Sequence, residues 1–403
     1  MKSIGLICFL FLFGAVSAQD LPSYIREAQE NNPEIQAFEF RYQIAEEKVR
    51  EVDRVPETQI SAGVFVSEPE TRTGAQKARF SVKQMLPWFG TLSLREQYAS
   101  ALAETEYIEY MIARRKLALQ VTQGYYNLHA LKAKQEVLDQ NITLLESYEQ
   151  LALTAVEVNQ ASAVDVLRLQ IRQNELLQQQ DILKQEYQGE RAAFNGLLAR
   201  EPEREIPVVS GVTVPESDPE TGDSLRLNPE LLRYDKLYES VARAEMLNQK
   251  EGAPTFGFGL DYIPVAERPG LDFTDNGKDI VMPMVTLNIP IFNSGYDSRT
   301  KQNQLRQREL ESLKRERLNV LETALVKAKA GRNTARIRYR TQQSNLKQAR
   351  DAEQILLRNY ETGTIDFNDV LEIQELQLKF QMEQIDAIRL YYEQTALIQY
   401  ITE

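Results

Sequence analysis

The chain has 403 residues, of which 26% are charged and 42% hydrophobic, and its formal net charge is −12. This composition excludes a disordered chain and allows a large folded core. The acidic balance excludes a nucleic-acid partner, because nucleic-acid binding requires basic patches. The sequence holds one cysteine, so it also excludes a disulfide-stabilised scaffold.

Residues 1–18 are typical of a secretory signal peptide. Lys2 provides the positive start, Ile4 to Phe13 form a short apolar run, and small residues end at Ala18. The run is too short to span a bilayer, so we expect cleavage after Ala18. Cys8 lies inside the run and follows a residue that is not small, which argues against lipidation.

Short motifs in the first half of the chain recur in the same order in the second half. Asn32-Pro33-Glu34 recurs as Asn228-Pro229-Glu230, Leu86-Pro87-Trp88-Phe89 as Ile289-Pro290-Ile291-Phe292, and Asp165-Val166-Leu167 as Asp369-Val370-Leu371. Matches in register indicate an internal duplication. We therefore predict a first repeat over 19–210 and a second over 211–403, which together form one structural unit. Each repeat is expected to run helix, strand, strand, long helix, helix.

The long helices give the strongest pattern. From Leu117 to Leu145, apolar residues recur at alternating steps of four and three, which predicts a heptad-like apolar stripe. No proline interrupts residues 91–158 or 296–360. At 1.5 Å per residue each helix would extend about 100 Å, far beyond an ordinary globular helix.

Four shorter segments alternate between apolar and polar residues. They are residues 58–67, 77–86, 254–263 and 280–289. Alternation over about ten residues is what a transmembrane β-barrel strand requires. A soluble domain with two amphipathic hairpins packed on helices is the alternative, which alternation alone does not exclude. The signal peptide, the aromatic flanks and the duplication favour the membrane interpretation.

Strand number then predicts an oligomer. Four strands cannot close a barrel, and an open edge cannot lie in lipid because its backbone N–H and C=O groups would lack partners. Two chains would supply eight strands and three chains twelve. A barrel of eight strands is nearly filled by its own side chains, whereas twelve leave a lumen, so a channel favours a homotrimer.

At this point the chain resembles the TolC-type outer membrane efflux family. The likeness rests on the doubled plan, the paired Asn-Pro-Glu helix openings, and the segment from Tyr360 to Glu372, which is close to the family's second helix tip. It implies a mainly α protomer whose trimer forms a twelve-stranded transmembrane β-barrel and a long α-helical barrel. It also implies the outer membrane of a Gram-negative bacterium, with a large periplasmic extension and outer-membrane lipid around the barrel. A periplasmic membrane-fusion adaptor and an inner-membrane pump, most simply of the RND type, are the implied partners.

The resemblance assigns roles to acidic residues at the tips. Asp369 and Glu372 match acidic rings at the periplasmic pore entrance, where three copies would favour cations. Asp165 and Tyr360 match contacts that close the entrance between neighbouring tips. The family has an arginine where this chain has Ile365, which removes charge-assisted bonds from that lock.

Helix capping is the competing explanation for two of these carboxylates. Ser162 with Asp165, and Asp366 with Asp369, fit an N-cap followed by an acidic residue at the third helical position. The two roles are compatible.

The remaining positions are structural predictions. Gly363 and Asn159 tolerate a left-handed backbone and are expected at the turns of the two helix hairpins. Four residues are expected at the junctions between strands and long helices, namely Pro87, Trp88, Pro290 and Phe292.

Nothing in the sequence indicates an enzyme, a cofactor or a metal centre. His129 is the only histidine and lies mid-helix, which favours a packed or solvated side chain over a ligand. Met282 and Met284 are soft metal ligands in principle, although gap-filling is the commoner role. The cluster Arg336-Arg338-Arg340 is interpreted as a solvated helix face.

The sequence thus predicts a passive exit duct of a tripartite efflux system, which conducts substrates from a periplasmic adaptor and pump to the outside. The short chain resembles the heavy-metal and cation branch of the family, so metal cations are a candidate cargo. The alternative is a secreted periplasmic coiled-coil adaptor or scaffold that does not insert in the membrane.

Overall fold

The computed structural model describes residues 21–157, 162–209, 211–219, 225–291, 294–362, 364–365 and 367–402. The predicted signal peptide with Cys8 lies outside the described residues, as do Asn159, Gly363, Asp366 and Phe292. The chain divides into two compact units. The first, here the helical unit, comprises Met1–Gln36, Arg114–Leu225 and Leu321–Glu403, and the second, here the strand unit, comprises Ala37–Ala113 and Arg226–Val320.

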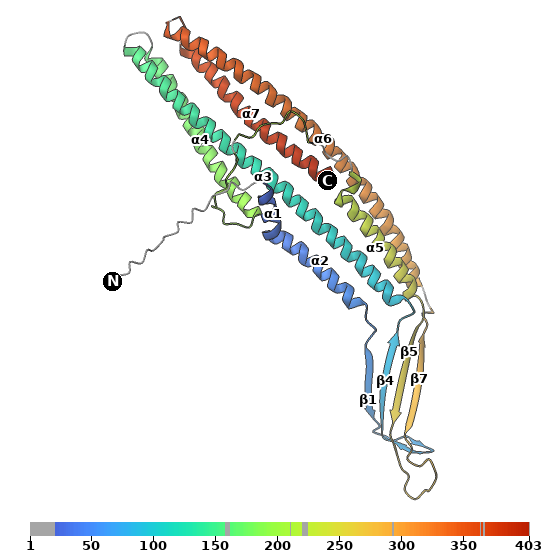
Figure 1. Ribbon diagram of the computed structural model, residues 1–403. Coiled ribbons are helices and arrows are strands. Elements are labelled where there is room, and N and C mark those ends of the chain that lie inside the picture. Colours follow the sequence, from blue (N-terminus) through green and yellow to red (C-terminus); the bar gives the residue numbers. More distant parts are fainter. Residues whose placement is uncertain are drawn as a thin grey trace, which may run out of the picture. The chain divides into compact units, whose positions relative to one another are not determined.

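The order helix, strand, strand, long helix, helix occurs twice along the chain (Figure 1). The first set is α1 (Leu21–Asn31), α2 (Pro33–Val52), β1 (Thr58–Val64), β4 (Ala78–Leu86), α3 (Thr91–Glu157) and α4 (Ala163–Leu197). The second set is α5 (Pro229–Glu251), β5 (Thr255–Ile263), β7 (Ile280–Asn288), α6 (Ser294–Glu361) and α7 (Phe367–Thr402). A short 3-10 helix, Leu225–Leu227, precedes α5. Helices α3 and α6 contribute residues to both units.

The recurring Asn-Pro-Glu motifs start helices in the same way. The Asn32 Oδ1 accepts a hydrogen bond from the Glu34 N–H at 2.9 Å, and the Asn228 Oδ1 accepts one from the Glu230 N–H at 2.9 Å. An asparagine cap satisfies a backbone donor that the helix leaves unpaired, and the proline that follows has no N–H to satisfy. The motif therefore recurs because each copy performs one capping task.

The two long helices have 67 residues in α3 and 68 in α6. Side chains three and four positions apart share one face of a helix, so the predicted apolar stripe of α3 faces the protein interior. Val121, Leu128 and Leu138 are fully buried there. Among the described residues, no helix is both long and apolar enough to cross a membrane.

The core of the helical unit joins both helix hairpins near their turns. Side chains from α3, α4 and α7 make up its buried centre. Its largest members are Leu138, Ile142, Leu145, Tyr148, Leu169, Leu176, Phe367, Leu371 and Leu378. Leu356, Leu357 and Tyr360 of α6 pack against this centre. Burying one such side chain stabilises the fold by about 1.5–3 kcal/mol, so this core holds the two hairpins together near their turns.

The strand unit contains a four-stranded antiparallel sheet in the order β1-β4-β5-β7 (Figure 1). One row of directly opposed residues runs Ile60, Val82, Leu260, Pro283. Strand β1 ends at Val64, three residues before the expected limit. The ladder continues for one bond, from the Phe65 N–H to the Lys77 carbonyl at 3.0 Å, before the chain leaves the sheet.

The segments that connect β1 to β4 and β5 to β7 contribute the strands of a second, smaller sheet. Its strands are β2 (Glu70–Thr71), β3 (Gly74–Gln76) and β6 (Val265–Ala266), in the order β2-β3-β6. Gly74 has φ +133°, and a Cβ added there would lie 1.9 Å from the Ala266 carbonyl oxygen. Only glycine fits this close approach, which lets two connectors far apart in the sequence pair with each other.

Candidate functional site

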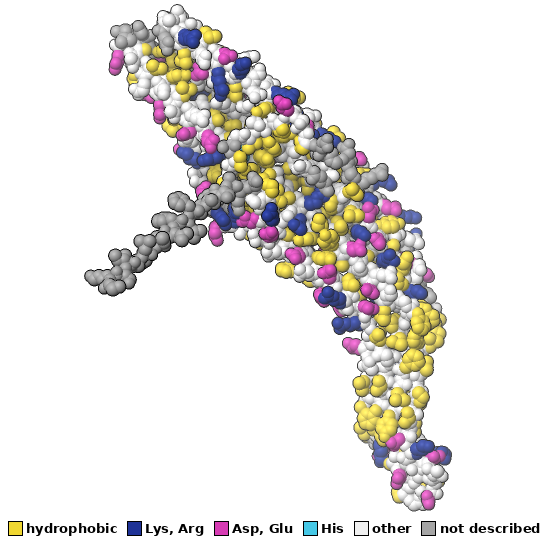
Figure 2. Space-filling view, in the orientation of Figure 1, with side chains coloured by type: hydrophobic (Ala, Val, Ile, Leu, Met, Phe, Trp, Pro, Cys, Tyr) yellow, Lys and Arg dark blue, Asp and Glu magenta, His cyan; other side chains and the backbone are white. Residues whose placement is uncertain are grey.

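The register of the large sheet separates its residues into two faces, because opposed residues share a face and successive residues alternate. One face is apolar across all four strands except at Thr58 and Gln84, which oppose each other near one end. It carries Ile60, Ala62, Val64, Phe80, Val82, Phe258, Leu260, Tyr262, Val281, Val285 and Leu287. Val285 is 76% exposed and Ile60 78% exposed. Apolar side chains gather over the strands in Figure 2. A continuous apolar surface of this kind marks a contact with lipid or with another protein.

The opposite face is mainly polar. It carries Gln59, Ser61, Arg79, Ser81, Lys83, Asp261, Thr286 and Asn288, together with Met85, Met282 and Met284. Asp261 is fully buried and forms an ion pair with Arg79 across the neighbouring strand. The sheet thus has one face suited to hydrocarbon and one suited to water.

Both edges of the large sheet are open within the described chain. Strand β1 pairs only with β4, and β7 pairs only with β5. Each edge strand therefore presents a row of backbone N–H and C=O groups to whatever lies beside it.

The predicted junction residues lie between a strand end and a helix start. Pro87 and Trp88 lie between β4 and α3, and Pro290 lies between β7 and α6. The Trp88 ring packs against Phe89 with centroids 5.8 Å apart, and Phe89 packs against Phe256 at 5.3 Å. An aromatic cluster therefore borders the sheet where α3 begins, as expected near a membrane interface.

In the helical unit, the tip residue Asp165 caps α4. The Asp165 Oδ2 accepts a hydrogen bond from the Ser162 N–H at 3.2 Å, and the Ser162 Oγ accepts one from the Val164 N–H at 3.2 Å. Asp165 is 8% exposed. The capping role expected from the sequence is therefore present in one protomer, which leaves a gating contact of Asp165 as a proposal.

Tyr360 and Phe367 pack together on either side of the α6–α7 turn. Their ring centroids are 4.9 Å apart in an edge-to-face arrangement, and Phe367 meets Tyr148 of α3 in the same way at 5.7 Å. The Tyr148 hydroxyl donates to the Glu353 carboxylate at 2.8 Å, and burial is the main reason that the pKa of Tyr148 is raised. These aromatic contacts fix the ends of both hairpins from within one chain.

Asp369 and Glu372 are both exposed and lie one turn apart on α7. Asn368 links Glu372 to the neighbouring hairpin, because its amide donates to the Glu372 carboxylate at 3.0 Å and its carbonyl oxygen accepts from Arg168 of α4 at 3.2 Å. The structure therefore places the two acidic residues on one accessible side of the tip, available to solvent or to another chain.

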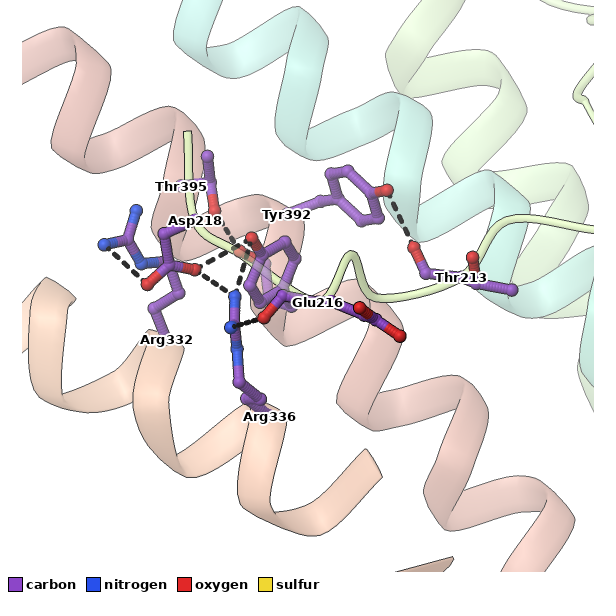
Figure 3. Close-up of polar contacts among 8 residues, drawn as sticks. Thr213, Glu216, Asp218, Arg332, Arg336, Tyr392 and Thr395 are labelled. Carbon is purple, nitrogen blue, oxygen red and sulfur yellow. Dashed lines mark hydrogen bonds and ion pairs between the residues drawn. The ribbon is translucent and has the colours of Figure 1, made fainter. Parts of the chain in front are cut away.

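A segment of the helical unit that the sequence did not single out carries a cluster of ion pairs and hydrogen bonds. The described residues 198–209 and 211–219 follow α4 and are called the strap. Asp218 of the strap lies between two arginines of α6 (Figure 3): the Arg332 Nη2 is 3.1 Å from its Oδ2, and Arg336 pairs with its Oδ1. The Tyr391 hydroxyl of α7 donates to the same carboxylate at 3.0 Å.

The strap is also bonded to the other helices of its unit. The Tyr392 hydroxyl of α7 donates to the Thr213 carbonyl at 2.9 Å (Figure 3), and the Val209 N–H donates to the Tyr125 hydroxyl of α3 at 3.1 Å. Tyr126 of α3 stacks on Tyr392 with centroids 4.4 Å apart. The strap therefore ties the α3–α4 hairpin to the α6–α7 hairpin at one level.

This cluster corrects one expectation. Arg336 is not on a solvated face: its side chain is 15% exposed and its guanidinium also donates to the Glu216 carbonyl at 2.6 Å. Arg338 and Arg340 are exposed, as expected. A signal was present in the sequence, since Arg332 occupies the apolar stripe of α6 between the buried Ala328 and Ala335. An arginine at a core position predicts a buried counter-ion.

His129 is packed under the strap. It is 5% exposed and lines a cavity of about 230 Å³ beside Val209, Val212 and Ile388. Burial lowers the pKa of His129, while the Glu136 carboxylate opposes that shift. Within the described ranges, no group of three or more His, Cys, Asp or Glu side chains is arranged to hold a metal ion.

Comparisons with known proteins identify solved structures that are similar to this architecture. No family model matches the sequence, and a search of curated proteins found no match. Among solved structures, the outer membrane protein VceC from Vibrio cholerae is 16% identical, with a TM-score of 0.73, over 95% of this chain and 96% of that chain. The Campylobacter jejuni outer membrane channel CmeC is 15% identical, with a TM-score of 0.76, over 95% and 85% of the two chains.

A third similar structure is CusC, whose description concerns folding and transmembrane channel formation. It is 14% identical, with a TM-score of 0.77, over 94% of this chain and 91% of that chain. Similarity that spans nearly the whole of each chain confirms the resemblance at the level of the fold. The chain therefore has the TolC-like fold that these outer-membrane channels share.

Proposed function

We propose that this protein is the outer-membrane exit duct of an efflux system and conducts substrates passively out of the periplasm. The observation that carries the proposal is the large sheet, with one continuous apolar face, one polar face and two open edges. A lone protomer in water would expose Val285, Ile60 and their neighbours without compensation. Contact with hydrocarbon on the apolar face and with water on the polar face removes the cost of exposing these apolar side chains to water.

The open edges support a trimer. Strand β1 of one protomer and β7 of the next each need a partner before the sheet can enter lipid, because every backbone polar group there must be paired. Closing the ring with three chains gives twelve strands and leaves a lumen, whereas two chains give eight strands and a filled interior. The duplicated element order supplies two strand pairs per chain, which suits such a wall.

The helical unit supports a periplasmic conduit that ends in a gate. Its two hairpins are held by their own core, and Asp369 and Glu372 lie exposed on one side of the tip. In a trimer they would form two acidic rings at the entrance and lower the energy of entering cations. Asp165 and Tyr360 would close that entrance against neighbouring tips. A membrane-fusion adaptor and an RND-type pump would dock at this end and supply the energy.

Metal cations are the cargo suggested by the acidic entrance. This part of the proposal concerns Asp369 and Glu372 alone, because the exposed carboxylates of one chain do not make a chelating site. A deletion strain compared with its parent for sensitivity to copper, cobalt, zinc, bile salts and dyes tests it. Sensitivity confined to the metals supports a metal cargo, and sensitivity confined to bile salts and dyes contradicts it.

The duct itself is tested by fractionation of cells that express the full chain. We expect the protein in the outer membrane as a trimer that dissociates on heating, and we expect efflux to be lost when the gene is deleted. Recovery as a soluble periplasmic monomer would overturn the proposal and favour the coiled-coil scaffold, because a scaffold needs no lipid around its strands.

A further inference from the structure

The charges on the polar face of the large sheet are unevenly balanced. Arg79 pairs with Asp261, and Lys77, just before β4, pairs with Glu68. Lys83 lies on the same face, where its neighbours in register are Gln59 on β1 and Gly259 on β5. Among the described residues, Lys83 forms no ion pair. One positive charge per chain is therefore left without a counter-ion on this face.

Two methionines lie beside Lys83 on the same face. Met284 of β7 completes the row Gln59, Lys83, Gly259, Met284, and Met85 follows Lys83 two residues later on β4. Methionine is an unexpected residue on a sheet face that contacts water, where serine or threonine would be better solvated. Methionine is flexible and polarisable, and it packs favourably against aromatic rings.

Two glycines of β5 make room for these thioethers. A Cβ added to Gly257 would lie 2.4 Å from the Met85 Sδ, and a Cβ added to Gly259 would lie 3.3 Å from the Met284 Cε. Both methionine side chains therefore lean over β5, Met85 from one side and Met284 from the other. Together with the glycine backbone they form a soft apolar floor next to an ammonium group.

We propose that Lys83, Met85 and Met284 form a wall site of the duct that contacts organic anions with an apolar, preferably aromatic, body during export. The inference rests on the proposed duct, which makes this face the lumen. The ammonium attracts the anionic group, as basic side chains do in anion-selective pores. The thioethers and the glycine floor take the apolar body.

The wall site is unfavourable for binding small metal cations. A soft cation would find two thioethers, but the ammonium of Lys83 lies in the same row as Met284 and repels it.

Conductance of the purified full-length protein in planar bilayers tests the site. The probes are 1-anilinonaphthalene-8-sulfonate as an aromatic anion and benzyltrimethylammonium as an aromatic cation. In the wild type we expect the sulfonate to block current at lower concentration than the ammonium compound. Lys83→Gln should weaken block by the sulfonate about fivefold, the factor expected for one ion contact in water. Lys83→Glu should reverse the order of the two probes.

Matched variants separate charge from apolar contact. Met85→Gln with Met284→Gln should weaken the sulfonate block while the reversal potential in a KCl gradient stays unchanged. Lys48→Gln removes a lysine paired with Glu51 on the exposed face of α2, so it should change neither reading.

The possible results are distinct. Equal sulfonate block and equal reversal potential in wild type and Lys83→Gln overturn the wall site while the duct stands. A wild-type protein that inserts in no membrane and conducts no current overturns the duct and this inference together. If Lys83→Glu fails to assemble, Lys83→Gln, which keeps a polar side chain of similar length, decides the matter.

Discussion

The two units of the chain differ in how far they bury apolar residues within one chain. In the helical unit, Leu138 and Leu176 are 0% and 1% exposed, and both hairpins share one core. In the strand unit, Val285 and Ile60 are 76% and 78% exposed although they lie in the middle of well-paired strands. Helices satisfy their backbone internally and need only side-chain packing, whereas a sheet with free edges also needs neighbours for its backbone. The helical unit therefore has a buried core within one chain, although Ile171 and Ile337 on its surface are 59% and 66% exposed. The strand unit leaves one whole face and both edges to be covered by its surroundings.

The largest effect is expected from a charge introduced on the apolar face of the sheet. Val285→Arg should abolish recovery of trimer from the outer membrane, because an arginine at the bilayer midplane costs about 2–4 kcal/mol per chain, three times over in a trimer. Outer-membrane fractionation with unheated electrophoresis measures it. Thr286→Arg, the next residue on the opposite face, is the matched control and should assemble. Equal assembly of the two variants would mean that the apolar face does not meet lipid.

A cavity created in the helical core tests how much its buried side chains stabilise the helical unit. Leu138→Ala should destabilise the helical unit by about 2–5 kcal/mol, because neighbouring side chains only partly fill the space left behind. Chemical unfolding of the full-length protein, followed by far-UV circular dichroism, measures it. Leu167→Ala is the control, since Leu167 is 58% exposed on α4 and should change stability by less than about 0.5 kcal/mol. A smaller loss for Leu138→Ala than for Leu167→Ala would show that Leu167 is buried by another chain.

Loss of the strap's carboxylate has an intermediate effect. Asp218→Asn leaves the largely buried Arg332 and Arg336 without their counter-ion, which should cost about 2 kcal/mol, less than a fully buried pair because Asp218 is 27% exposed. Hydrogen exchange and protease cleavage of residues 211–219 should both become faster. Asp181→Asn, which removes an exposed partner of Lys184, should leave the strap unchanged. Unchanged exchange in Asp218→Asn would show that other bonds, such as those to Tyr125 and Tyr392, hold the strap without this carboxylate.

The long helices could be predicted from local patterns in the sequence. Features that depend on pairing between distant residues could not. The stripe from Leu117 to Leu145 lies within one helix, so its periodicity alone predicted where α3 is buried. The strands were predicted from alternation, but the bend after Val64 and the β2-β3-β6 sheet depend on pairing between distant connectors. Such pairing leaves no local periodicity in the sequence.

Some features of the candidate site could likewise be predicted from local patterns, and others could not. The two sheet faces followed from alternation, whereas the balance of charge on the polar face needed the register that pairs Arg79 with Asp261. The Asp218 cluster joins residues more than a hundred positions apart, and only the core position of Arg332 hinted at it. The roles given to Asp369, Glu372 and Tyr360 depend on contacts between chains, so they stay predictions.

A smaller effect separates capping from gating at the tip. Ser162→Ala and Asp165→Asn both weaken the cap of α4, at about 1 kcal/mol each, so both should lower the unfolding temperature slightly. Only Asp165→Asn should raise the conductance of trimers in bilayers, if Asp165 also holds neighbouring tips together. Equal conductance of the two variants would assign Asp165 to capping alone.

The smallest expected effect is a dependence of stability on pH that arises at His129. Burial lowers the pKa of His129 in the folded protein below its value in the unfolded chain, where it is about 6.5. The folded state therefore favours the neutral imidazole. Stability from this group is complete above the unfolded pKa and falls as the pH drops below it, because the unfolded chain then binds the proton more readily. The loss stops growing once the pH is below the folded pKa.

Because His129 is the only histidine, its titration is open to direct measurement in a full-length protein labelled only at histidine. NMR of the imidazole should give a midpoint below 6.5, and protease cleavage of the strap should increase between pH 6.5 and that midpoint. His129→Gln keeps a polar side chain of similar size and cannot take up the proton, so cleavage of this variant should not change over that interval. The charged groups that line the same cavity as the imidazole are Lys132 and Glu136 of α3. A midpoint at or above 6.5 would show that water reaches the imidazole and that the strap does not seal the cavity above it.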